Sequence, residues 1–175
     1  MTQASPSSTA ATQSRTQVRG PIPCLTFKDS CEEAVKFYVS LFPNSRIVSM
    51  QRSDGKSPIP EGKLLNATFE LNGHEYTAFD GGPTFFFTEG ASLMVTCQTQ
   101  QEIDDLWQRL SEGGEPGPCG WLKDRFGLSW QIVPAALGEM LGNPTKGNSQ
   151  KAMEAMLKMG KLDIAALERA YRSGA

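Results

Sequence analysis

The sequence has few residues that typically bind metals and no excess of charge of one sign. It has a single histidine, and its four cysteines never form a Cys-x-x-Cys pair, so a structural zinc site is not expected. Basic and acidic residues are nearly balanced, with 17 Lys and Arg against 19 Asp and Glu. Such a chain lacks the basic surface that binds a phosphate backbone. We therefore expect no nucleic-acid partner.

Long apolar runs are missing as well. No window approaches the roughly 20 apolar residues of a membrane-spanning helix, and residues 1–19 lack the apolar core of a secretory signal. Residues 1–20 are rich in Ser, Thr, Gln and Ala, which predicts a disordered tail. A transit peptide is the alternative, but Arg15 and Arg19 are the only basic residues there. We expect a soluble, cytoplasmic protein with no membrane partner and with reduced cysteines.

What the sequence does contain is an internal repeat, in which an apolar β-type run leads into an amphipathic helix. Ser30 with Glu33, and Thr99 with Glu102, each have the spacing of a helix capping box. The apolar stripes after these caps match at the same offset, and the matched pairs are Ala34 with Ile103, Phe37 with Leu106, Tyr38 with Trp107, and Leu41 with Leu110. The repeat predicts two copies of one unit.

Each unit is predicted to have the order β-α-β-β-β. The strand-like runs are 22–27, 47–51, 64–71 and 75–79 in the first copy, and 92–97 and 129–133 in the second. Asn72-Gly73 predicts a two-residue hairpin turn. After Pro134 the pattern becomes helical, and Asp163 is predicted to cap the last helix. We expect modules at 21–89 and 90–134 and a C-terminal helical extension at 135–175.

Three segments carry a resemblance to a known family. Residues 119–134 read CGWLKDRFGLSWQIVP, residues 80–83 read DGGP before Phe85 and Phe87, and residues 33–38 read EAVKFY before Leu41-Phe42-Pro43. These segments resemble the PhnB-like branch of the vicinal oxygen chelate (glyoxalase/bleomycin-resistance) superfamily, whose members often bear the label 3-demethylubiquinone-9 3-methyltransferase. The resemblance spans roughly residues 21–172. It implies an α+β fold in which paired βαβββ modules curl into a mixed-sheet cup for a small molecule, usually in a homodimer.

Metal-dependent members of this superfamily take His, Gln or Glu ligands from the first and last strands of each module. The equivalent positions here are Ile22 or Pro23, Tyr76 or Thr77, Ser92, and Gln131. At best one neutral amide stands where three or four ligands are needed. We therefore expect no metal and no cofactor.

The methyltransferase label can also be tested against the sequence. S-adenosylmethionine is most often held by a Gly-rich loop between a strand and a helix. Gly81-Gly82 are followed by Pro83 and a Phe-rich segment, and Gly113-Gly114 come after a predicted helix instead of preceding one. We interpret the label as a family name. His74 follows a turn and has no nucleophile paired with it by motif.

Two functional interpretations remain open. In the first, the chain binds a small, partly apolar molecule through polar side chains that face the cup, which are Gln131, Ser92, Thr96 and Ser129. In the second, it is a metal-independent lyase, isomerase or transferase with Glu75 or Asp80 as general base. Strand alternation places Gln131 opposite Trp130, so Gln131 faces the cup if Trp130 packs under the helices.

Overall fold

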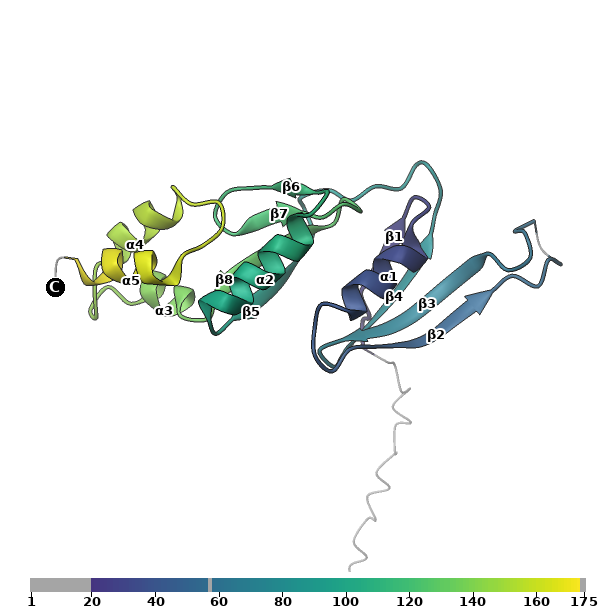
Figure 1. Ribbon diagram of the computed structural model, residues 1–175, viewed down its shortest axis with the longest axis horizontal. Helices are drawn as coiled ribbons and strands as arrows, with labels where there is room; N and C mark the ends of the chain where they lie inside the picture. The colour runs from purple at the N-terminus through teal and green to yellow at the C-terminus, as the bar shows by residue number, and fades with distance from the viewer. Residues whose placement is uncertain (1–19, 57, 174–175) are drawn as a thin grey trace, which may run out of the picture.

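The computed structural model describes residues 20–56 and 58–173. The predicted tail at 1–20 lies outside these residues apart from Gly20. Figure 1 shows two sheet-and-helix modules side by side, with the C-terminal helices beyond the second module, at the end of the molecule away from the first.

The first module follows the predicted β-α-β-β-β order. It comprises β1 (Cys24–Phe27), α1 (Cys31–Val39), β2 (Arg46–Arg52), β3 (Leu64–Leu71) and β4 (His74–Asp80). The sheet order is β1-β4-β3-β2, with β1 parallel to β4 and the other pairs antiparallel. Asn72 and Gly73 both have positive φ, at 47° and 82°, as a tight hairpin turn requires.

The second module repeats this plan with shorter strands. It comprises β5 (Ser92–Cys97), α2 (Gln100–Ser111), β6 (Glu115–Pro116), β7 (Trp121–Lys123) and β8 (Ser129–Pro134). Its sheet order, β5-β8-β7-β6, has the same pattern of one parallel and two antiparallel pairs. The α+β repeat is thus confirmed, although the two sheets, as formed by residues 20–56 and 58–173, stay separate and do not close into one cup.

The helical extension consists of α3 (Leu137–Gly142), α4 (Ser149–Met156) and α5 (Ile164–Arg172). These helices share a small core of Met140, Ala152, Leu162 and Leu167. Asp163 caps α5 as predicted, because its side chain accepts a hydrogen bond from the amide of Ala166 at 2.7 Å. No helix within the described residues is long and apolar enough to cross a membrane.

The two repeated helices begin in different ways. Thr99 and Glu102 form the predicted capping box of α2. The box predicted for α1 is wrong, since Ser30 makes no side-chain capping bond and Glu33 lies 3.4 Å from the guanidinium of Arg125. The carboxylate of Asp80 instead accepts a hydrogen bond from the amide of Cys31 at 2.9 Å. The start of α1 therefore depends on a residue at the end of β4.

One hydrophobic core runs through both modules, and Trp130 lies inside it. The Trp130 ring packs edge-on against Tyr38 of α1, with 5.4 Å between ring centroids, and stacks with Phe42. Cys31 and Cys97 are buried, and all four cysteines are free thiols. The modules are thus joined through an aromatic cluster on their helix-covered faces.

Candidate functional site

The candidate site is a hollow of about 470 Å³ on the second sheet, on the face opposite α2. Strand β7, the loop before it and the start of β8 form most of its wall. Its lining is largely apolar and consists of Glu89, Glu115, Pro116, Gly117, Pro118, Trp121, Leu122, Lys123 and Ser129. A volume of this size fits the cavities in which proteins bind small molecules.

Strand alternation explains which side chains face this hollow. Trp130 and Ile132 of β8 are buried in the core, so Ser129 and Gln131 point to the opposite face. On the neighbouring strand, Trp121 pairs with Gln131 and Lys123 pairs with Ser129, and paired residues share a face. The open face therefore presents an indole, an ammonium, an amide and a hydroxyl side by side.

Ser129 is the buried polar group of this face. It is only 1% exposed, and no described residue offers its Oγ a hydrogen-bond partner. A buried hydroxyl left unpaired costs roughly 1–3 kcal/mol. The hydroxyl thus lies unpaired at the wall of the hollow, and a bound molecule whose polar atom displaced the atoms covering it would satisfy it.

Charged groups lie at the edge of the hollow. The ammonium of Lys123 forms an ion pair with Glu89, which precedes the second module. The hydrogen bond and charge of Glu89 raise the pKa of Lys123, and Lys123 correspondingly lowers the pKa of Glu89. Glu89 is mostly exposed, so solvent screens this pair and it can open without a large loss of stability.

The predicted ligand-binding residues share this face but differ in their surroundings. The amide Nε2 of Gln131 donates a hydrogen bond to Oγ of Ser92 at 2.9 Å, beside the hollow. Thr96 lies further along β5, where it lines two hollows near Phe42 and Asn72. The structure thus brings Gln131, Ser92 and Ser129 together and leaves Thr96 apart.

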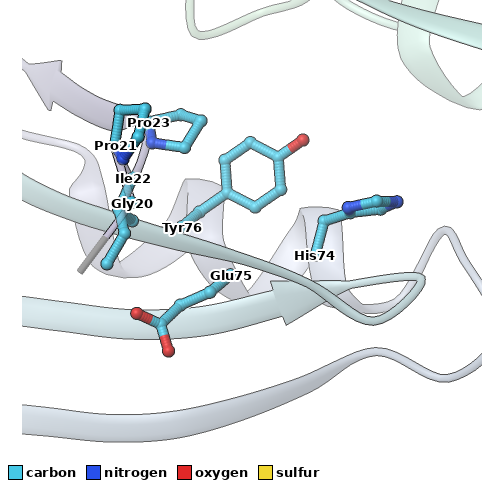
Figure 2. A pocket seen from close by; sticks show the side chains of 7 residues that line it. All are labelled: Gly20, Pro21, Ile22, Pro23, His74, Glu75 and Tyr76. Atoms are coloured by element: carbon cyan, nitrogen blue, oxygen red, sulfur yellow. The ribbon is translucent and has the colours of Figure 1, made fainter. Parts of the chain in front are cut away.

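The two predicted catalytic carboxylates lie on the first module. Figure 2 shows Glu75 and Tyr76 on opposite sides of β4 in a separate hollow of about 430 Å³, which is also lined by Pro21, Ile22 and Pro23. Asp80 caps α1. Neither side chain lines the hollow on the second sheet, and a role for either as general base stays a prediction.

The side chains at the ligand positions of metal-dependent relatives do not fit a metal. Ile22, Pro23 and Tyr76 line the hollow in Figure 2 without a strong ligand set among them. Within residues 20–56 and 58–173, no three His, Cys, Asp or Glu side chains gather as a metal site requires. The amide of Gln131 is engaged with Ser92.

A buried carboxylate lies behind the site, on the helix side of the second sheet. Oδ2 of Asp124 accepts hydrogen bonds from the hydroxyl of Tyr38 at 2.7 Å and from the indole of Trp130 at 2.8 Å, while its Oδ1 accepts from the amides of Phe126 and Leu128. Burial raises the pKa of Asp124 and, with the Asp124 charge, raises that of Tyr38 well above its usual value. Asp124 thus caps the turn before β8 from a buried position.

Comparison with known proteins identifies the family. Residues 19–133 match the family model described as 3-demethylubiquinone-9 3-methyltransferase. The chain belongs to this family. A PhnB protein from Bacillus cereus is 39% identical, with a TM-score of 0.60 over 67% of this chain and 100% of its own. The predicted PhnB-like family is thereby confirmed.

More distant structures show the fold alone. Protein PA1353 from Pseudomonas aeruginosa is 23% identical, with a TM-score of 0.55 over 67% of this chain and 98% of its own. The fosfomycin resistance protein FosX from Listeria monocytogenes is 18% identical, with a TM-score of 0.54 over 72% of this chain and 98% of its own. Comparison with curated proteins gave no match.

Sequence reasoning did not select several residues of this candidate site, chiefly Trp121, Lys123 and Glu89. The strand that carries Trp121 and Lys123 has only three residues, which is too short for period-2 alternation to be recognised. The signal that was available is the family-like segment 119–134, which contains Trp121 and Lys123. Glu89 belongs to the connection between modules, which no periodic pattern marks.

Proposed function

We propose that this PhnB-like chain binds a small, partly apolar molecule in the hollow on the second sheet. The observation that carries the proposal is the buried Oγ of Ser129, unpaired by the described residues at the wall of a largely apolar hollow. The ring of Trp121 supplies apolar contact area, and the hydroxyl supplies orientation. A ligand with an apolar body and a carbonyl or hydroxyl group fits these features.

The alternative of a metal-independent enzyme has less support. A general base must reach the proton that it removes, and neither Glu75 nor Asp80 lines the hollow that contains Ser129. Asp80 also accepts the capping hydrogen bond of α1. The glycines that precede the Phe-rich segment follow β4 and lead into the connection between modules, not into a helix, so they do not favour an S-adenosylmethionine site.

The proposed binding uses no metal, because the residues at the family's ligand positions are poor ligands. Elemental analysis of the purified protein is expected to find no stoichiometric zinc, nickel, iron or manganese. One tightly held transition metal per chain would contradict this part of the proposal. The four free thiols favour a reducing compartment, and we propose the cytoplasm.

Ser129→Ala tests the proposal through two effects of opposite sign. Removing an unpaired buried hydroxyl is expected to raise the free energy of unfolding by up to about 1 kcal/mol, since its desolvation cost disappears. The same change is expected to weaken a ligand that bonds to Oγ by about 1–3 kcal/mol. Native mass spectrometry identifies the ligand retained on purification, and calorimetry measures both affinities.

Ser92→Ala is the matched control. Its Oγ already accepts a hydrogen bond from Gln131, so we expect this variant to lose stability instead of gaining it. The proposal fails if Ser129→Ala binds the retained ligand as tightly as the wild type. It also fails if native mass spectrometry and screening of small, partly apolar molecules yield no ligand that contacts Trp121 or Ser129.

A further inference from the structure

The C-terminal helices lie outside the region that the family model matches, so the resemblance expected over residues 21–172 is too long at its C-terminal end. The family model ends at residue 133, whereas α3 begins at Leu137. The similarity to the Bacillus cereus protein extends over the whole of that protein but over only 67% of this chain. Figure 1 shows α4 and α5 at the end of the molecule beyond the second sheet. Their contacts with the family fold therefore indicate what the extension adds.

The connector between α4 and α5, residues 157–163, makes those contacts. It meets the loop at residues 117–120, which precedes β7. The amide of Cys119 donates to the carbonyl of Met159 at 2.7 Å, and the amide of Gly120 donates to the carbonyl of Gly160 at 2.8 Å. Two consecutive amides of the loop are thus held by two consecutive carbonyls of the connector.

The loop is fixed from its other side by β8. The carbonyl of Gly120 accepts a hydrogen bond from the amide of Ile132 at 2.8 Å. Gly120 has φ of +83°, and a Cβ there would lie 2.6 Å from the carbonyl oxygen of Ile132 and 3.1 Å from the side chain of Leu162. The loop is therefore packed tightly between the connector and the sheet.

The connector is in turn anchored to α2. The side chain of Gln100 donates through Nε2 to the carbonyl of Leu162 at 3.0 Å and accepts through Oε1 from the amide of Ile164 at 2.8 Å. Lys161 forms an ion pair with Asp104, one turn further along the same helix. Gln100 thus links the extension to the second module through side-chain hydrogen bonds.

The loop that the connector holds is also a wall of the candidate binding site. Gly117 and Pro118 line the hollow, and the amide of Gly117 bonds to the carbonyl of Trp121 at 2.8 Å. We propose that the C-terminal extension positions this wall, so that ligand affinity depends on the connector and on Gln100, which touches no ligand. The inference rests on the proposed binding function and adds a positioning residue to it.

The test is Gln100→Met in the full-length chain, because methionine keeps the side-chain length and removes the hydrogen bonds of Gln100 to Leu162 and Ile164 of the extension, together with its bond to Asp104 on α2. Gln101→Met is the control, since Gln101 lies next to it on α2 and its side chain bonds, among the described residues, only to Asp105 on the surface. Two measurements are made on nitrogen-15-labelled protein: hydrogen exchange of the Cys119 and Gly120 amides, and titration with 8-anilinonaphthalene-1-sulfonate followed at the Trp121 indole resonance.

Gln100→Met is expected to speed exchange at Cys119 and Gly120 and to weaken the probe roughly three- to tenfold, because the binding-competent loop is populated less. Gln101→Met is expected to change neither quantity. Lys161→Met serves as a second variant if Gln100→Met does not fold, and it is expected to act in the same direction. All variants are measured well below their unfolding temperatures. Under these conditions a loss of global stability alone leaves exchange by local opening unchanged.

The outcomes separate the two proposals. If the probe shifts Trp121 in the wild type while Gln100→Met leaves exchange or affinity unchanged, the positioning role is wrong and the binding site stands. If the wild type shows no shift at Trp121, the binding site is contradicted. Faster exchange in Gln100→Met would in that case show that the extension still holds the loop.

Discussion

Asp124 accepts four hydrogen bonds from buried or half-buried groups, two of them from side chains of different modules. Its pKa is raised by burial, while these hydrogen bonds act in the opposite direction. The native state therefore keeps the proton of Asp124 to a higher pH than the unfolded chain does. Between the unfolded and native pKa values, native protein binds more protons, so this residue's contribution to stability falls as the pH rises.

We predict that the pH dependence of stability changes in Asp124→Asn. Going up from about pH 4, the usual pKa of aspartate, wild-type stability should decline relative to the variant until the native pKa is passed. Urea unfolding of both proteins between pH 3.5 and 7 measures this difference. A wild type that gains stability relative to the variant over this interval would show that the hydrogen bonds outweigh burial.

Gln131→Leu is predicted to separate folding from binding. Trp130 and Ile132 still pack on the opposite face of β8, so the variant should fold. It removes the donor to Ser92 and is expected to weaken a ligand in the adjacent hollow by about 1–3 kcal/mol if that ligand bonds to the amide. Calorimetric titration with the retained ligand compares the two proteins. Equal affinities would leave Gln131 as a part of the sheet only.

At the scale of single elements, the two capping sequences predict different costs of mutation. Thr99→Ala removes the side-chain bond to the Glu102 amide and should cost about 1 kcal/mol of stability. Ser30→Ala is expected to be nearly neutral, because Ser30 makes no capping bond through its side chain. Thermal or urea unfolding of both variants gives the comparison, and equal losses would mean that Ser30 caps α1 after all.

These two caps also show what could be predicted from the sequence. Periodicity and turn chemistry identified the repeat, six strands and the capping box of α2, because each depends on residues close together in the chain. The cap of α1 comes from Asp80, 49 residues away, and no local pattern contains it. Strand length limits the prediction in a similar way. Period-2 alternation can be recognised on the six-residue strand that carries Ser129 and Gln131, but not on the three-residue strand that carries Trp121.

At the scale of the whole molecule we predict a homodimer. In the part of the chain that the structure describes, both sheets have unpaired edge strands, and apolar side chains remain exposed, among them Met94 at 64% on the open face of the second sheet and Leu157 at 61% after α4. Light scattering should report about twice the 19.1 kDa chain mass. Truncation after Pro134 should weaken the dimer. A monomeric wild type would contradict the prediction, and an unchanged dimer after truncation would remove the helices from the interface.

The difference between the two caps bears on the order in which the repeats assemble. Both side chains of the α2 capping box lie within four residues, so the start of this helix needs no distant part of the chain. The start of α1 is completed only when β4 has docked beside β1, after a loop of about fifty residues has closed. We therefore expect the two copies of one unit to differ in folding, with the start of α2 set by local contacts and that of α1 set only after β4 has paired with β1.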